Sequence, residues 1–278
     1  MALALGLVLT GCGSGAPSGP VSATPSATES VPVSDFGDPR SPGTYVFTTA
    51  DGKFRCMLVT SAHQAAEVTC GPDPQNGGAF PADLPAVIDR DPGRTRTVTP
   101  NLIDLLAGEP PALLHSRLSP VLDVNATFGV LPYGKTLSAG TLSCDVDEHT
   151  GVGCRDESGH SFRISSDAAT LQPTGPMPTE IVIDGLGISA QGALTYRDTT
   201  PDSPNLSAPL AAEATIMSIG AGPMCQQPAD HLVVLPNGHA DEPCTVDRMR
   251  TAPGLSTALA TLRLIDGRVV ALWELHRG

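Results

Sequence analysis

Cysteine and histidine are the residues of this chain whose types and spacing could support chemistry. The 278-residue sequence contains seven of each. Two cysteines and two histidines fall within one short segment and could supply zinc ligands: Cys144, His149, Cys154 and His160. This segment lacks the Cys-x2–4-Cys spacing that is typical of structural zinc sites. We therefore expect the two cysteines to form a disulfide.

The first cysteine, Cys12, follows an apolar run that covers residues 1–9. A spanning helix needs about 20 apolar residues, so the run fits the hydrophobic region of a secretory signal better than a membrane anchor. The sequence Leu9-Thr10-Gly11-Cys12 resembles the lipobox of bacterial lipoproteins, in which the cysteine is lipidated and the chain is cut before it. We predict a lipoprotein signal peptide at residues 1–11 and a palmitate-type lipid on Cys12. The departure from the pattern is that no Lys or Arg precedes Arg40.

The other six cysteines form an even set, which outside the cytoplasm indicates disulfides. Each cysteine and its next neighbour flank a short loop between strand-like runs, so we predict pairing in sequence order. The predicted disulfides are Cys56–Cys70, Cys144–Cys154 and Cys225–Cys244.

Other candidate chemical groups have simpler interpretations. His160 could be a ligand or an acid–base group, but beside Gly159 we favour a structural hydrogen bond. The carboxylates of Asp145, Asp147 and Glu148 could bind Ca²⁺ weakly, but they lack EF-hand spacing and fit a solvated turn. The sequence contains no nucleophile elbow, P-loop, His-Glu-x-x-His or Gly-x-Gly-x-x-Gly motif. We therefore predict no catalytic, cofactor-binding or metal-binding residues, and no cofactor.

The composition excludes several classes of protein. The chain has a formal net charge of −13, 29 glycines, 27 prolines and only 4% aromatic residues. A coiled coil, a long helical bundle and a basic nucleic-acid-binding protein are excluded by these values. Only Lys53 and Lys135 are lysines among 16 basic residues, an imbalance typical of GC-rich coding and of actinobacteria.

The distribution of residues along the chain predicts a mainly β protein. Residues 12–42 are rich in Ser, Pro, Ala, Thr and Gly and are predicted to form a flexible tether. Disulfide-stapled β-hairpin modules are expected to build two small β domains: a β module with two Cys hairpins at residues 43–171, and a β-rich region with the third disulfide at residues 172–278.

Two local elements are predicted in more detail. Leucines at helical spacing predict one short helix within Asn101–Leu118, ending before Glu109 because Pro110 and Pro111 follow. Asp266-Gly267 lies between two apolar runs and predicts a β-hairpin with a type I′ turn, which needs positive φ at both residues.

Three motifs follow one another in one segment of the chain: a Leu-Pro-x-Gly opening at residues 131–134, a Cys…Gly-Val-x-Cys hairpin at residues 144–154, and a Gly-His-x-Phe strand at residues 159–162. These motifs carry a resemblance to a family of small cell-envelope lipoproteins from mycobacteria and related actinobacteria. It covers about Gly43 to Leu171, and Ser161 stands where the pattern has glycine. The resemblance implies an envelope location and a disulfide-bonded β module, and it implies no particular chemistry.

These observations together predict a lipid-anchored protein on the extracytoplasmic face of the cell membrane. We expect a non-catalytic binding or structural role, with an envelope lipid, glycan or protein as the ligand, and no nucleic acid. The alternative is an envelope hydrolase acting on cell-wall glycan or peptide. A cleft that joins His160 or His239 to a carboxylate and a hydroxyl would favour the hydrolase.

Overall fold

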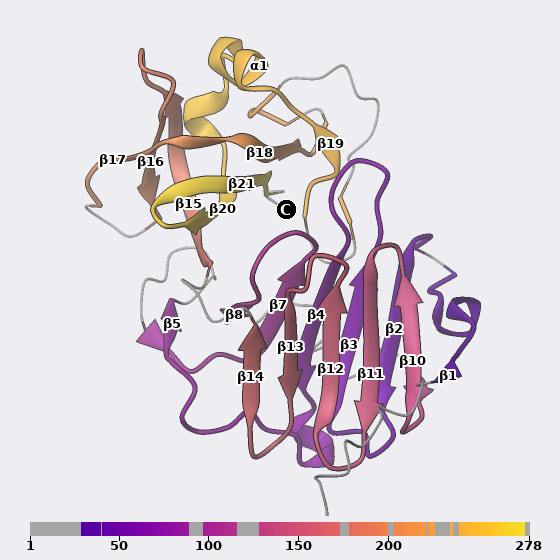
Figure 1. The fold of residues 1–278 in the computed structure, drawn as a ribbon. Helices are drawn as coiled ribbons and strands as arrows, with labels where there is room; N and C mark the ends of the chain where they lie inside the picture. The colour runs from indigo at the N-terminus through magenta and orange to yellow at the C-terminus, as the bar shows by residue number, and fades with distance from the viewer. Residues whose placement is uncertain are drawn as a thin grey trace, which may run out of the picture.

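The fold is a mainly β structure in which a sandwich carries a second, smaller β body (Figure 1). The computed structural model describes residues 29–39, 41–88, 97–115, 128–172, 178–199, 203–220, 222–225, 234–235 and 239–275. The predicted signal peptide, Cys12 and the first part of the predicted tether lie outside the described residues. We call the two parts the sandwich, up to residue 172, and the C-terminal body, from residue 178.

The sandwich consists of two six-stranded sheets. The front sheet, which is nearer the viewer in Figure 1, has the order β1 (Glu29–Ser30), β10 (Lys135–Ala139), β11 (Leu142–Asp147), β12 (Gly151–Asp156), β13 (Ser161–Ile164), β14 (Ala169–Gln172). The back sheet has the order β8 (Ala112–Leu114), β7 (Leu102–Leu106), β4 (Glu67–Pro72), β3 (Phe54–Val59), β2 (Thr44–Thr49), β9 (Gly129–Leu131). Strands β5 (Val87–Ile88) and β6 (Thr97–Val98) form a separate two-stranded sheet.

The core of the sandwich lies between these sheets, and period-two patterns direct side chains into it. In β11, Leu142, Cys144 and Val146 are buried, whereas the intervening residues face outward and are partly exposed. The disulfides Cys56–Cys70 and Cys144–Cys154 lie within this core and join directly opposed residues of neighbouring strands. The third disulfide, Cys225–Cys244, lies in the core of the C-terminal body, so the cysteines pair in sequence order.

Strand β7 of the back sheet is buried at every position, and this explains one wrong prediction. The helix predicted within Asn101–Leu118 is wrong, because Leu102–Leu106 is strand β7. Leu105 points into the sandwich core, while Leu102 and Leu106 pack in separate clusters outside that core. A strand buried on both faces has apolar residues at nearly every position, so its sequence can also match a helical pattern.

Two strands of the sandwich each precede a strand of one sheet in the chain but pair with the other sheet. Strand β1 precedes β2 in the chain but pairs in parallel with β10 in the front sheet. Strand β9 precedes β10 but pairs in parallel with β2 in the back sheet. Residues 29–39 of the predicted tether are thus packed on the sandwich, and Phe36, in a 3-10 turn, is buried in its core.

The C-terminal body is built on a seven-stranded sheet. Its order is β17 (Leu206–Ala208), β16 (Leu194–Asp198), β15 (Thr179–Ile188), β20 (Ala260–Ile265), β21 (Arg268–Glu274), β18 (Leu210–Ser218), β19 (Glu242–Pro243). Helix α1 (Val246–Thr251) and a 3-10 turn at Leu255–Thr257 pack against β15. Asp266 and Gly267 join β20 to β21 with φ of 50° and 72°, which confirms the predicted hairpin turn.

Candidate functional site

The densest group of charged side chains among the described residues lies buried between the sandwich and the C-terminal body. Around it, Leu106 of the back sheet packs in an apolar cluster with residues of the C-terminal body. Those residues are Met217, Ile219, Ala240, Ala271 and Trp273. The charged groups are therefore shielded from water by the contact between the two parts.

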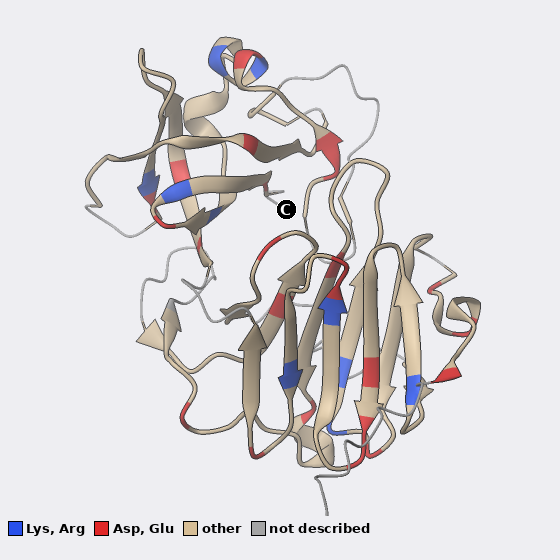
Figure 2. Cartoon of the chain, viewed as in Figure 1, with Lys and Arg blue, Asp and Glu red and all other residues tan. Residues whose placement is uncertain are grey.

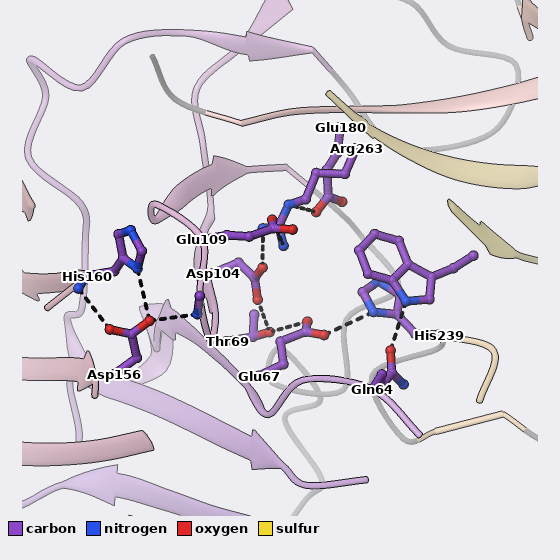
Figure 3. Close-up of polar contacts among 12 residues, drawn as sticks. Gln64, Glu67, Thr69, Asp104, Glu109, Asp156, His160, Glu180, His239 and Arg263 are labelled. Atoms are coloured by element: carbon purple, nitrogen blue, oxygen red, sulfur yellow. Dashed lines mark hydrogen bonds and ion pairs between the residues drawn. The ribbon is translucent and has the colours of Figure 1, made fainter. Parts of the chain in front are cut away.

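The centre of the site is the fully buried guanidinium of Arg263, on β20 (Figure 3). It lies 2.6 Å from a carboxylate oxygen of Asp104, on β7 of the sandwich. It also lies 3.1 Å from Glu180, its cross-strand neighbour on β15, and 3.3 Å from Glu109, in the turn after β7. One cation thus joins three carboxyl groups from both parts of the molecule. The charge of Arg263 is favoured because these carboxylates outweigh the effect of burial and raise its pKa.

Two further contacts made by buried carboxyl groups extend the site. The Thr69 hydroxyl donates a hydrogen bond of 2.9 Å to Asp104, and Glu67 Oε2 lies 3.0 Å from His239 Nδ1 (Figure 3). Burial and the Glu67 carboxylate raise the pKa of Asp104 well above its usual range, against the effect of Arg263. Burial alone would raise the pKa of Glu67, but His239, the hydrogen bond from Asp104 and Arg263 lower it to about 2. The surroundings thus shift the pKa values of these two neighbouring carboxyl groups in opposite directions.

The far end of the site contains stacked rings. His239 stacks on Trp273 with ring centroids 4.2 Å apart and an interplanar angle of 13°. The indole Nε1–H of Trp273 donates a 2.9 Å hydrogen bond to Gln64 of the sandwich. Asp241 accepts hydrogen bonds from Gln64 and Ser61, so this end also links the two parts.

The predicted candidate His160 lies at the end of the front sheet, on the opposite side of Glu109 from Arg263 (Figure 3). Its Nδ1 is 3.0 Å from the buried Asp156 carboxylate, which also accepts N–H bonds from Gly108 and from His160 itself. Burial would raise the pKa of Asp156, but these hydrogen bonds lower it. Asp156 and Ser158 line a groove of about 450 Å³ between the turns of the two sheets. The Asp156 side chain thus joins the turn after β7 to the turn after β12, and His160 forms a hydrogen bond to it, as the sequence predicts for His160.

The other predicted candidates are not brought together into a metal site. Cys144 and Cys154 are disulfide-bonded, so they are not thiolate ligands for zinc. Asp145 pairs with Arg163 at 2.6 Å, and Asp147 accepts the N–H groups of its own turn. Within the part of the chain that the structure describes, no group of three or more His, Cys, Asp or Glu residues is arranged to hold a metal ion.

The residues at the centre of the site, Asp104 and Arg263, were not predicted from the sequence. A signal was present in the sequence, because Asp104 and Arg263 each interrupt an apolar strand, Leu-Ile-Asp-Leu-Leu and Leu-Arg-Leu. A charged residue at such a position must be paired when the strand is buried. The sequence could not show which charges pair, because the partners are separated by 159 residues.

Three disulfides indicate an extracytoplasmic protein. Over the described ranges, no helix has the length and apolar character needed to cross a bilayer. The chain matches no protein-family model, no curated protein and no solved structure.

Proposed function

We propose that this protein is a lipid-anchored component of the cell envelope with a non-catalytic binding or structural role. The supporting observation is the use of its cysteines. Three disulfides take up six of the seven cysteines, so Cys12 is the one cysteine that they leave over. Cys12 ends the lipobox-like sequence Leu9-Thr10-Gly11-Cys12, where lipidation needs a free thiol.

The outer surface of the front sheet favours binding of a polar partner in the envelope. Acidic and basic residues are interspersed on its strands (Figure 2). A shallow groove of about 270 Å³ on this face has polar side chains in its lining, among them Arg155, Thr170 and Gln172, beside the apolar Phe162. Such a surface favours hydrogen bonding to a glycan or a protein over contact with acyl chains.

The anchor is tested with the variant Cys12→Ala, expressed in the native host. We expect the variant to move from the membrane fraction to the soluble extracytoplasmic fraction and to lose incorporation of a labelled fatty acid. The variant Ser14→Ala is the matched control and should stay with the membrane. Retention of the Cys12→Ala protein in the membrane fraction would show that the anchor proposal is wrong.

An envelope hydrolase is the second candidate function, and the pairing of His160 with Asp156 beside a groove favours it. A histidine held by a buried carboxylate is oriented to act as a general base. Purified protein incubated with cell-wall material separates the two candidates. A binding protein sediments with the wall and releases no fragments. A hydrolase releases soluble fragments, and His160→Asn, with Asp156 intact, abolishes that release.

A further inference from the structure

The shallow groove on the outer face of the front sheet lies over four neighbouring strands, β11 to β14, and this face is turned toward the viewer in Figure 2. Directly opposed residues of antiparallel neighbours point to the same face of a sheet, so the outward residues of the groove form cross-strand rows. One row contains Arg155, Ser161 and Gln172. The adjacent row contains Asp145, Gly153 and Arg163.

The arginine of the second row already has its partners. A terminal nitrogen of Arg163 lies 2.6 Å from a carboxylate oxygen of Asp145, and the other donates a 3.2 Å hydrogen bond to the Thr150 hydroxyl. The guanidinium lies over Gly153, where a Cβ atom would be 2.5 Å from one of its nitrogens. Arg163 is therefore fixed on the sheet, and Asp145 balances its charge.

Arg155, in the first row, has no such partner. Its side chain is exposed and forms no ion pair with any residue that the structure describes. Its cross-strand neighbours, Ser143 on β11 and Ser161 on β13, are uncharged. The lining of the groove thus has two arginines against one aspartate, in a chain whose formal net charge is −13. A ligand with a negative group complements this groove, whereas the acidic surface elsewhere repels such a ligand.

The other groups of the groove favour a glycan as the carrier of that negative group. Ser161 and Gln172 offer a hydroxyl and an amide that can donate and accept hydrogen bonds, as sugar hydroxyls do. They follow Arg155 at the strand spacing of about 4.8 Å, which is close to the length of one sugar unit in an extended chain. The backbones of β12 and β13 are paired with strands on both sides, so an extended peptide finds no strand edge to join here.

We propose that this groove binds a glycan chain that carries carboxylate groups, and that Arg155 is the residue that holds a carboxylate. One uncompensated guanidinium balances one monovalent carboxylate, and its planar fork can donate two parallel hydrogen bonds to the two oxygens. Ser161 and Gln172 bind hydroxyl groups of the adjoining sugar units. This inference rests on the proposed binding role and names the class of ligand for it.

The experiment titrates the full chain with a short oligomer of galacturonate and with the methyl ester of the same oligomer, followed by isothermal titration calorimetry. The two probes have the same sugar chain, but the ester has no carboxylates. We expect the free acid to bind and the ester to bind at least about tenfold more weakly, because hydrogen bonds between charged groups are lost.

The variant Arg155→Gln tests the assigned residue. It keeps a polar side chain and removes the charge, so binding of the free acid should weaken by about tenfold or more. Arg248→Gln is the matched control, because it removes the same charge from another exposed arginine, on α1 of the C-terminal body. It should bind the free acid as the wild type does. Both side chains are exposed, so both variants should keep the circular dichroism of the wild type.

Equal binding of the free acid and the ester would overturn the inference, as would an Arg155→Gln variant that binds the free acid as tightly as the wild type. Tighter binding of a sulfated dextran oligomer, or of an oligoglutamate peptide, would also overturn it by assigning the groove to a sulfate ester or to an acidic protein segment. A wild type that sediments with cell-wall material but does not bind galacturonate contradicts only the inference. A wild type that binds neither contradicts the proposed binding role as well.

Discussion

At the scale of single residues, the fully buried Arg263 pairs with carboxyl groups from both the sandwich and the C-terminal body. A buried ion pair is weak support for stability on its own, since desolvation of the charges offsets their attraction. Removal of one partner has a large effect, however, because the other charges stay buried without compensation. The carboxyl groups that would lose Arg263 as a partner are those of Asp104, Glu109 and Glu180.

We therefore predict that Arg263→Met lowers the free energy of unfolding by about 3–5 kcal/mol, measured by urea denaturation at neutral pH. Met is apolar and of similar length, so the change is mainly one of charge. The matched variant is Arg250→Met on α1, where the arginine is half exposed and pairs with Asp247 at 2.9 Å. Its effect should stay below about 1 kcal/mol, as for other surface ion pairs. Equal effects of the two variants would show that Arg263 does not neutralise the buried carboxylates.

At the scale of elements, the Gly-Val-x-Cys motif has a direct structural reason. Gly151 begins β12 with φ of 76°, and a Cβ atom there would lie 2.0 Å from the carbonyl oxygen of Ile164. Gly153, two residues on, lies beneath the Arg163 guanidinium, which pairs with Asp145. The two glycines thus let β13 and its side chains approach the backbone of the hairpin.

Gly151→Ala should therefore destabilise the protein more than Gly134→Ala, which serves as its control. Gly134 also has a positive φ, 70°, but no atom lies within 4 Å of a Cβ placed there. Both variants lose about 1–2 kcal/mol from backbone strain. The steric overlap at Gly151 adds about 1–3 kcal/mol more. Chemical denaturation of the two variants side by side measures the difference, and equal losses would mean that the hairpin can shift away from Ile164.

Elements that depend on neighbouring residues were predictable from the sequence, whereas those that depend on distant partners were not. The hairpin disulfides and the Asp266-Gly267 turn follow from residues close together in the chain. Strand β7 was mistaken for a helix because burial on its second face comes from elsewhere in the molecule. Arg263 and Asp104 were missed for the same reason: their pairing exists only after the C-terminal body has packed on the back sheet.

At the scale of the whole molecule, the two sheets of the sandwich exchange one strand each. Strand β1 adds to the front sheet and β9 to the back sheet, although each strand precedes the opposite sheet in the chain. The two exchanged segments also meet, since Gly129 of β9 leaves room for the Phe36 ring. Neither sheet is complete without a segment that leads into the other, so the two should unfold as one cooperative unit.

Phe36→Ala tests this cooperativity, because the buried ring lies where the exchanged segments meet. We expect a loss of about 3–5 kcal/mol, typical of truncating a buried phenylalanine, and an equal fall in native-state hydrogen-exchange protection in β3 and β11. Phe128→Ala is the control: this ring is half-buried and contacts Arg55 at the surface of the back sheet, so its loss should be smaller. If Phe36→Ala reduces protection in β11 alone, the two sheets are separate folding units. The exchange of β1 and β9 would then be a local contact without a role in holding the sandwich together.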